Sequence, residues 1–275
     1  MAKISAGSIV LVTGASTGIG AATARRLSAA GCRVFGTSRK PAQGGGTVTM
    51  LPMDVRDAQS VAACVGEVIK AAGRIDALVN NAGYGIAASV EDTSVEDMLR
   101  QLDTNLFGAL RVIHAVVPHM RVQGAGRIVQ VSSLAARAGI PFQGAYSASK
   151  AALSLMSEAL SIELAPFGID VVSVEPGDTQ TQFTGMRAWT EAAKTSITYG
   201  ARARHAIAVM ENSERKGAPA DRVARVIEVA LRAERPKLRY VSVTMTERGL
   251  LFLLGIIPAR AFESLMRSIY EPPRR

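Results

Sequence analysis

The segment AYSASKAAL, residues 145–153, places a tyrosine four residues before a lysine, at Tyr146 and Lys150. Residues spaced by four lie on one face of a helix, so the phenol and the ammonium are expected to be close together. A free tyrosine has a pKa of about 10, and phenolate is therefore scarce at neutral pH. A nearby ammonium favours phenolate, which predicts that Tyr146 exchanges a proton with a substrate oxygen while Lys150 lowers the tyrosine pKa. The alternative is an aromatic residue that merely lies beside a solvated lysine.

A glycine-rich segment near the N-terminus predicts a site for a diphosphate. SIVLVTGASTGIGAATARRL, residues 8–27, has the pattern of a strand, a turn and a helix, with glycines at 14, 18 and 20. Gly14 permits a tight turn, whereas Gly18 and Gly20 let the backbone approach a phosphate closely. The helix N-terminus offers free N–H groups and a partial positive charge to the same phosphates. Directly after the first strand, such a turn is a strong indication of a nucleotide site.

Together these motifs resemble the short-chain dehydrogenase/reductase family. The glycine spacing is G-x-x-x-G-x-G, residues 80–83 read NNAG, and Y-x-x-x-K falls at 146–150. The resemblance extends from about Ile9 to Val243, with the motifs in the family's order. It implies a Rossmann-like, doubly wound parallel α/β sheet of about seven strands flanked by helices. It also implies that a carbonyl and an alcohol are interconverted by hydride transfer with a nicotinamide cofactor.

The resemblance supplies two further catalytic residues. Ser133, at the end of RIVQVSS, matches the family's catalytic serine and is expected to hydrogen-bond the substrate oxygen. Strand alternation turns its neighbour Ser132 the other way. Asn105 matches the family's helix asparagine, which supports a proton relay through Lys150. With Tyr146, all four catalytic positions are filled, which disfavours a non-catalytic NADP(H)-binding regulatory protein.

The end of the predicted second strand indicates which nicotinamide cofactor binds. An NAD-preferring protein is expected to carry Asp or Glu there, whereas TSRKP places Ser38 at that position, followed by Arg39 and Lys40. The 2′-phosphate of NADP(H) pairs well with a guanidinium. We therefore predict NADP(H), selected mainly by Arg39, because Thr17 occupies the family's other basic position. The alternative is an exposed arginine in a loop.

The resemblance implies further cofactor contacts, which fall at the carboxyl ends of predicted strands, where open α/β sheets bind ligands. The predicted cofactor-binding residues are Gly14, Ser16, Thr17, Gly18, Ile19, Gly20, Arg39, Asp54, Val55, Asn81, Ala82, Gly83, Tyr146, Lys150, Pro176, Gly177 and Thr179. In this set Asp54 and Val55 are expected at the adenine, and Pro176, Gly177 and Thr179 at the nicotinamide.

Short β-branched runs alternate with longer helical segments along the chain, which predicts a parallel sheet within one domain, residues 1–275. The predicted strands are 8–13, 33–38, 47–55, 77–82, 127–133, 170–176 and 239–243. The predicted helices are 18–30, 57–72, 94–121, 146–165 and 219–234.

Two segments fall outside this alternation. Residues 178–217 are too long for a plain connection and are expected to form a substrate lid with short helices. The apolar C-terminal extension, 246–275, is expected to cover the cleft, pack on another subunit or touch a membrane surface.

The predicted substrate contacts are largely apolar. They are Ser133, Tyr146, Phe183, Met186 and Trp189, with Tyr84, Leu134, Phe142 and Tyr199 as further lining. They favour an apolar or lipid-like carbonyl. The alternatives are small polar or acyl-thioester ketones, with Phe183 and Trp189 only anchoring the lid.

Composition limits the remaining function classes. Apolar residues make up 48% and charged residues 20%, typical of a globular protein. No apolar run reaches the roughly 18 residues of a membrane span, and the N-terminus lacks the pattern of a signal peptide. Two cysteines and three histidines predict neither a metal site nor a disulfide framework, and favour the cytoplasm.

The net charge and two long predicted helices indicate which macromolecular partners to expect. The net charge is +9, but no run of five or six basic residues predicts nucleic-acid binding. A basic nucleic-acid or membrane-surface protein remains the alternative from another class. The helices at 97–121 and 146–165 resemble those through which the family forms dimers and tetramers, so a homodimer or homotetramer is expected.

Overall fold

A seven-stranded parallel sheet lies at the centre of the molecule. The computed structural model describes residues 3–41, 46–254 and 256–272. The strands run in the order β11-β7-β6-β4-β1-β2-β3, and each neighbouring pair is parallel. Their bounds are β1 Ile9–Val12, β2 Arg33–Ser38, β3 Val48–Pro52, β4 Ala77–Asn80, β6 Gly126–Val131, β7 Ile169–Pro176 and β11 Arg239–Ser242. The predicted Rossmann-like architecture is confirmed, because all seven predicted strands form this sheet.

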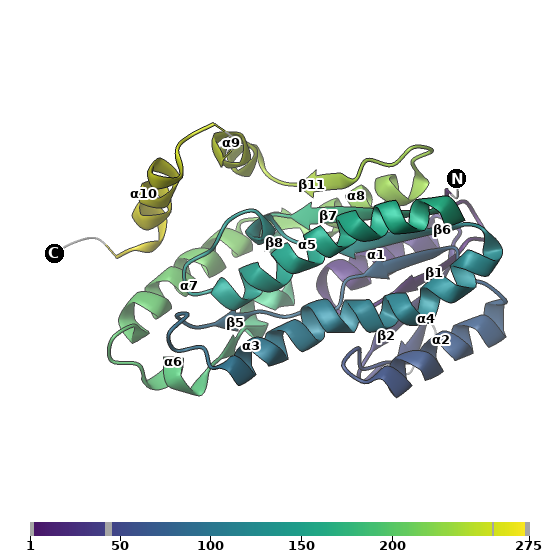
Figure 1. Ribbon diagram of the computed structural model, residues 1–275, viewed down its shortest axis with the longest axis horizontal. Coiled ribbons are helices and arrows are strands. Elements are labelled where there is room, and N and C mark those ends of the chain that lie inside the picture. Colours follow the sequence, from purple (N-terminus) through teal and green to yellow (C-terminus); the bar gives the residue numbers. More distant parts are fainter. Residues whose placement is uncertain (1–2, 42–45, 255, 273–275) are drawn as a thin grey trace.

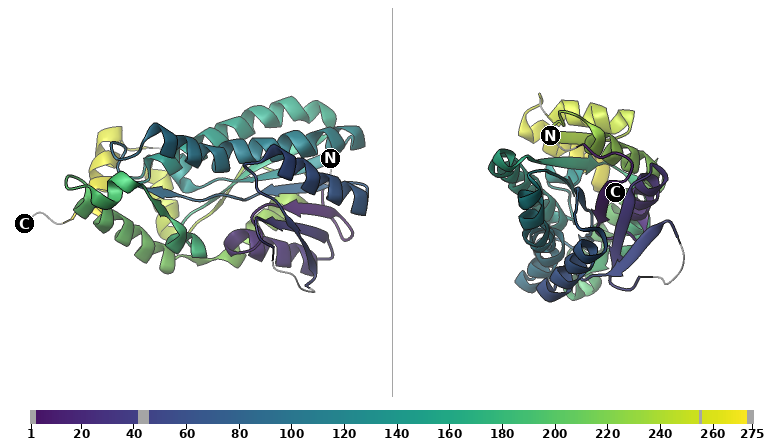
Figure 2. Two further views of the ribbon diagram at one scale, coloured as in Figure 1. Left: turned by 90° about the horizontal axis from the view of Figure 1, so that it is seen from below. Right: turned by 90° about the vertical axis from the view of Figure 1, so that its right-hand side faces the viewer.

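Helices cover both faces of the sheet (Figures 1 and 2). One face carries α2 (Ala58–Ala72), α4 (Gly108–Gln123) and α5 (Gly144–Leu164), whereas α1 (Gly18–Ala29) and α8 (Ala220–Arg232) lie on the other. Even the fully buried β1 alternates, because Ile9 and Leu11 pack toward the first set and Val10 and Val12 toward the second. The sheet therefore separates two hydrophobic cores.

The strand order reverses beside β1, which pairs with β2 on one side and β4 on the other. Chain connections leave this point in opposite directions, so the loops after β1 and β4 spread apart. In open α/β sheets the resulting crevice at the carboxyl ends of the strands binds ligands. The glycine turn and the NNAG segment both lie at this crevice.

The helix predicted at 94–121 is interrupted. It consists of α3 (Val95–Leu102), a π-helical turn at Asp103–Phe107 and α4. A Cβ atom on Gly108 would lie 2.7 Å from the Val55 side chain, so α4 packs directly on the loop after β3. The wider π turn places Asn105 in the interior, with 1% of its surface exposed. Sequence periodicity alone does not mark such a turn.

The insertion at 178–217 has secondary structure of its own. It contains β8 (Thr179–Gln180), a 3₁₀ turn at Gln182–Met186, β9 (Ala188–Trp189), α6 (Glu191–Thr195) and α7 (Gly200–Arg215). β8 pairs with β10 (Ala218–Pro219), and β9 pairs with β5 (Ile86–Ala87). These two small parallel ladders attach the insertion to the rest of the molecule.

The predicted C-terminal extension forms α9 (Met245–Leu254) and α10 (Ala259–Tyr270) beyond the carboxyl end of β11 (Figure 1). Residues 255 and 273–275 of this extension lie outside the described part of the chain. None of the helices in the described ranges is long and apolar enough to cross a membrane.

Candidate active site

A cavity of about 700 Å³ opens at the carboxyl ends of the sheet strands; we call it the catalytic cavity. Sixteen of the seventeen predicted cofactor residues and four of the five predicted substrate residues lie on its wall. On the wall lie Gly14, Ser16, Thr17, Gly18, Ile19, Arg39, Asp54, Val55, Asn81, Ala82, Gly83, Ser133, Tyr146, Lys150, Pro176, Gly177, Thr179, Phe183 and Met186. Gly20, Asn105 and Trp189 are not part of the wall.

The glycine turn has a geometry that fits a diphosphate. Gly14 and Gly18 have φ angles of +65° and +56°, which disfavour any residue with a side chain. A Cβ atom on Gly20 would fall on the carbonyl oxygen of Gly14, so this glycine packs behind the turn and not on the wall. At the start of α1, the Thr17 side chain caps no N–H group and the first turn carries no acidic residue. These N–H groups therefore remain available to an anion.

Asn81 fastens the glycine turn to β4. Its side-chain Nδ2 donates to the carbonyl oxygens of Thr13 and Gly14, at 2.9 and 3.1 Å. The Thr13 hydroxyl accepts from the backbone N–H groups of Asn81 and Ala82, at 2.9 and 3.0 Å. Thr13 therefore holds the crevice together, a role that nothing in the sequence pattern indicated.

The far end of the catalytic cavity contains an exposed cation. Arg39 lies on its wall and forms no ion pair with any described residue, whereas Arg56 pairs with Asp54 at 2.6 Å. Hydrogen bonds from Arg56 lower the pKa of Asp54 to about 2. The Ser38 hydroxyl beside Arg39 is buried and has no hydrogen-bond partner within the described ranges. An unpaired guanidinium and an unsatisfied hydroxyl at the end of β2 fit a phosphorylated ribose.

Lys150 lies deep under the wall, with 5% of its surface exposed. Its Nζ donates to the carbonyl oxygen of Val131 at 2.8 Å and lies 5.9 Å from the centroid of the Tyr146 ring. Burial lowers the pKa of Lys150 to about 8. The helix α5 thus brings the two residues onto one face, as the spacing of four predicts.

The direction of the Tyr146 pKa corrects the sequence-based expectation. Burial raises the pKa of Tyr146 to about 12, and a hydrogen bond with Ser133 offsets only part of this rise. Desolvation disfavours the phenolate form. The raised pKa favours the protonated phenol at neutral pH.

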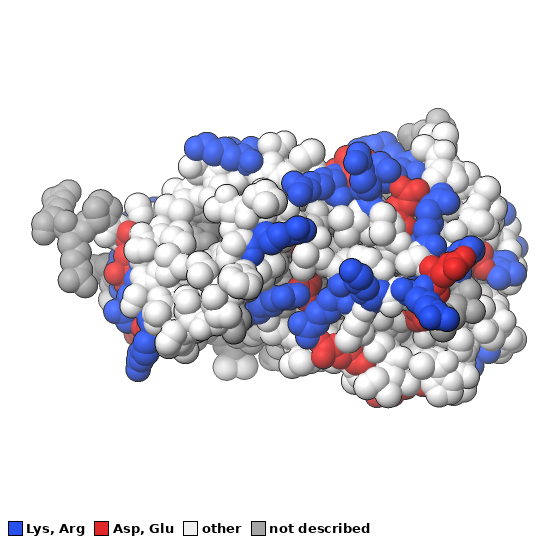
Figure 3. All heavy atoms as spheres, turned by 90° about the horizontal axis from the view of Figure 1, so that it is seen from above, with Lys and Arg blue, Asp and Glu red and all other residues white. Residues whose placement is uncertain are grey.

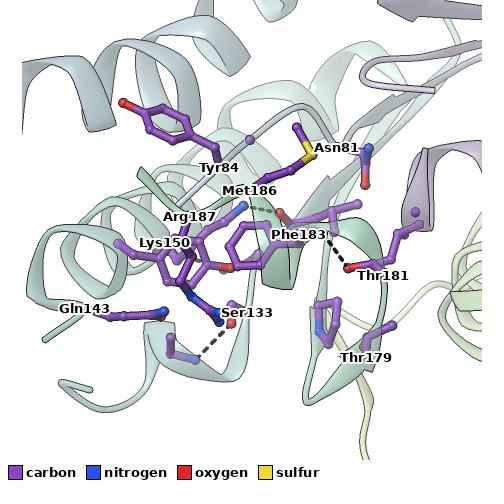
Figure 4. A pocket seen from close by; sticks show the side chains of 18 of the residues that line it. Asn81, Tyr84, Ser133, Gln143, Lys150, Thr179, Thr181, Phe183, Met186 and Arg187 are labelled. Carbon is purple, nitrogen blue, oxygen red and sulfur yellow. Dashed lines mark hydrogen bonds between the residues drawn. The ribbon is translucent and has the colours of Figure 1, made fainter. Parts of the chain in front are cut away.

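The two neighbouring serines point in different directions, as strand alternation predicts. The Ser133 hydroxyl lies on the cavity wall and accepts a hydrogen bond from the N–H of Ala135 at 3.1 Å (Figure 4). The Ser132 hydroxyl is buried between Ser154, at 2.7 Å, and the carbonyl oxygen of Lys150, at 3.2 Å. Ser133 can reach a ligand, whereas Ser132 fastens β6 to α5.

Asn105 lies behind the wall and braces it. Its amide donates to the Tyr84 carbonyl and the Ser149 hydroxyl, each at 3.0 Å, and accepts from the Tyr84 N–H at 3.1 Å. A Cβ atom on Gly83 would lie 3.1 Å from the Asn105 side-chain oxygen and 3.6 Å from Lys150 Nζ. The glycine of NNAG thus leaves room for the side chains of both Asn105 and Lys150 beside the backbone.

The insertion contributes a second wall opposite the catalytic residues (Figure 4). The ring of Phe183 lies 5.5 Å from that of Tyr146, and the Arg187 guanidinium lies 5.3 Å from the Phe183 ring centroid. Arg187 pairs with Glu214 of α7, and both side chains are largely buried. This pair holds the 3₁₀ turn against α7 and keeps Phe183 beside Tyr146.

Trp189 does not line the catalytic cavity, contrary to the prediction. It lies in β9 opposite Ala87 and packs against two small hydrophobic clusters. It therefore anchors the insertion, which was the alternative interpretation. Of the further lining residues, Tyr84 and Leu134 face the catalytic cavity, whereas Phe142 and Tyr199 face a neighbouring one.

The C-terminal helices complete the catalytic cavity, which sequence reasoning left open. Leu250 and Leu251 of α9 and Phe262 and Met266 of α10 lie on its wall. Glu247 of α9 accepts a hydrogen bond from the backbone N–H of Asp178. This contact ties α9 to the loop after β7, so the extension covers the cleft.

Acidic side chains also lie on the wall of the catalytic cavity near α9, namely Asp178, Glu214 and Glu247. Burial, together with Glu247 and Glu214, raises the pKa of Asp178 to about 6. No sequence signal marked Asp178, Arg187 or Glu214 as wall residues. Among the residues that the structure describes, no group of three or more His, Cys, Asp and Glu side chains could hold a metal ion.

Comparisons with known proteins agree with this geometry. A family model described as short chain dehydrogenase matches residues 8–192. A 3-ketodihydrosphingosine reductase of Bacteroides thetaiotaomicron is 43% identical over 209 residues, which cover 76% of this chain and 78% of that protein. Human 17-beta-hydroxysteroid dehydrogenase type 1 is 34% identical, covering 88% and 78% of the two chains. The crystal structure of a short-chain dehydrogenase from Streptomyces avermitilis superposes with a TM-score of 0.79 at 31% identity, covering 95% of this chain and 99% of that one.

Proposed function

The chain belongs to the short-chain dehydrogenase/reductase family, and on this premise we propose that it reduces the carbonyl group of an apolar or lipid-like substrate with NADP(H). The observation that carries the proposal is the position of Tyr146. Its ring lines the cavity with Ser133, and Lys150 Nζ lies 5.9 Å from the ring centroid, at one end of a cavity whose other end fits a dinucleotide.

In the reductive direction, Tyr146 would act as the proton donor. A phenol whose pKa is about 12 is protonated at neutral pH and can donate its proton to a carbonyl oxygen. Ser133 hydrogen-bonds the same oxygen and stabilises the negative charge that develops on it. Lys150 supplies positive charge beneath the ring. A bound nicotinamide would supply the hydride to the carbonyl carbon.

The preference for NADP(H) over NAD(H) is supported by Arg39. It is the cation on the cavity wall beyond β2 that lacks a carboxylate partner within the described residues, while Arg56 is committed to Asp54. A guanidinium in this position matches a 2′-phosphate. We propose that Arg39 is the main selector.

The substrate class follows from the wall of the catalytic cavity and from the relatives. Phe183, Met186, Leu250, Leu251 and Phe262 make its substrate side largely apolar. Two similar proteins carry names that refer to a sphingoid ketone and to hydroxysteroids, which are both lipids. We therefore favour a lipid-like ketone over small polar or acyl-thioester ketones, and assign residues 178–217 as the substrate lid.

Assembly and compartment are part of the same proposal. Leu155 and Ile162 of α5 are 64% and 77% exposed, which suits a homodimer or homotetramer. A monomeric mass in light scattering would contradict it. Cys32 and Cys64 are free and buried, in keeping with a reducing cytoplasm. On the face drawn in Figure 3, Lys and Arg predominate, with Asp and Glu beside several of them. The proposal excludes nucleic acid as a partner because the sequence has no run of five or six basic residues.

The Tyr146→Phe variant separates an enzyme from a binding protein. The phenylalanine keeps the ring against Phe183 but removes the proton donor, so NADPH oxidation with a ketone should fall by roughly 10²- to 10⁴-fold. The dissociation constant for NADPH, measured by fluorescence, should change less than threefold. Undiminished turnover would rule out Tyr146 as the donor.

A further inference from the structure

A second cavity of about 550 Å³ lies beside the catalytic cavity; we call it the distal cavity. It is bounded by the loop at 137–142, by the start of α7 and by α10. Its volume falls within the range of roughly 300–1,000 Å³ that is usual for small-molecule sites. None of the predicted catalytic or cofactor residues lines it.

The two cavities meet along α10. Phe262, Met266 and Tyr270 line both, together with Ala138 from the loop that follows the catalytic serine. The three α10 residues are spaced by four and so form one stripe of the helix. Ile269 lies only on the catalytic side, whereas residues 259, 263, 267 and 271 lie only on the distal side. The two cavities therefore adjoin along this stripe of α10.

The distal cavity has an apolar floor. Phe142 and Tyr270 pack against a hydrophobic cluster that includes Ile207 and Met210 of α7. Burial raises the pKa of Tyr270 to about 12, so its phenol is neutral. An apolar, uncharged floor suits hydrocarbon and gives a polar ligand little to bind.

Ion pairs form the rim. Arg202 pairs with Glu271 at 3.0 Å, and Arg267 pairs with Glu263 at 2.7 Å. Arg137 is committed to the buried Glu175 at 2.6 Å. Because each rim arginine already has a carboxylate, the rim is not arranged to capture a free anion.

We propose that the distal cavity binds the far end of a long alkyl chain whose ketone lies at Tyr146. This inference rests on the proposed function and adds the shape of the substrate: a linear chain that passes the stripe on α10, not a compact ring system confined to the catalytic cavity. The shared residues make the two cavities adjoin, and the apolar floor supplies the binding energy.

Gly139 provides a direct test. It lines the distal cavity but not the catalytic one, and a Cβ atom there would meet nothing within 4 Å, so Gly139→Trp is chosen to occupy the cavity. Gly66 of α2 is equally open and lines neither cavity, which makes Gly66→Trp the matched control. Ala259→Trp fills the same space from α10 and serves if the first variant does not fold.

The measurement is kcat/KM with NADPH for 2-hexanone and 2-hexadecanone. Gly139→Trp should lower the value for the sixteen-carbon ketone at least tenfold, since each buried CH₂ contributes about fourfold in affinity. The value for the six-carbon ketone should change less than twofold, and Gly66→Trp should change neither. Equal effects on both ketones, or none on the longer one, would overturn the proposal.

A binding measurement tests the distal cavity without relying on catalytic turnover. In a Tyr146→Phe background, calorimetry with 2-hexadecanone should give at least tenfold weaker binding when Gly139→Trp is added. If the parent chain reduces neither ketone, the proposed function fails, while this titration still decides the distal cavity. If Tyr146→Phe/Gly139→Trp binds 2-hexadecanone as tightly as Tyr146→Phe does, the distal cavity does not bind the alkyl chain. This holds even if the protein proves to be a reductase.

Discussion

The cofactor side and the substrate side of the catalytic cavity are built in different ways. On the cofactor side, backbone geometry dominates: two glycines with positive φ angles, the uncapped N-terminus of α1 and the Asn81 bonds to the turn. On the substrate side, side chains from three distant segments meet, held by the Arg187–Glu214 pair and by the Glu247 contact. The first construction fixes which reaction occurs, whereas the second can change its substrate without disturbing the sheet.

If the cofactor side and the substrate side act independently, reversing a charge on the cofactor side should change only the preference between NADPH and NADH. For Arg39→Asp we expect the KM for NADPH to rise roughly 10- to 100-fold, because charge-assisted hydrogen bonds to the 2′-phosphate are lost. The KM for NADH should change little. Lys40→Asp, with the same change in charge one residue later, is the control. Parallel losses with both cofactors would show that Arg39 does not select.

The pH dependence of kcat tests the role of Lys150, which lies between the cofactor side and the substrate side of the catalytic cavity. Burial lowers the pKa of Lys150, so its positive charge is present below a pH of about 8 and is lost above it. Reductive kcat should therefore fall about tenfold for each pH unit above 8. In Lys150→Arg, which stays charged, this fall should move to higher pH. A flat profile to pH 9.5 would mean that the lysine charge is not needed.

A smaller effect is expected from the substrate side. Arg187→Met frees the 3₁₀ turn that carries Phe183, so the KM for the ketone should rise roughly threefold to tenfold while the KM for NADPH stays unchanged. Arg204→Met, on the exposed face of α7, should be neutral. The double variant Arg187→Met/Glu214→Met should recover part of the loss, because it leaves no uncompensated buried charge. An equal rise in the KM for NADPH would show that the two sides are coupled.

The same contrast explains what the sequence could predict. The strands, the glycine turn and the spacing of Tyr146 and Lys150 depend on local patterns, and the structure brings them together as predicted. The position of Trp189 depends on the long-range pairing of β9 with β5, which no local pattern reveals.

Burial accounts for the other difference between prediction and structure. The Tyr146 pKa was expected to fall, but partial burial of the ring, with Phe183 packed against it, raises it. The meeting of the two cavities along α10 likewise becomes visible only when the extension is seen against α7. Desolvation is a property of the assembled fold, and spacing along a sequence does not encode it.

The central proposal, an NADP(H)-dependent reductase of lipid-like ketones, is tested most directly by one assay. Ketones, aldehydes and alcohols from short and polar to long-chain and steroidal would be supplied with NADPH and with NADH, and cofactor absorbance would be followed. We predict NADPH oxidation with apolar ketones, at a kcat/KM at least tenfold above that with NADH or with small polar ketones. Turnover only with NADH, or turnover of none of the carbonyl compounds, would contradict the proposal.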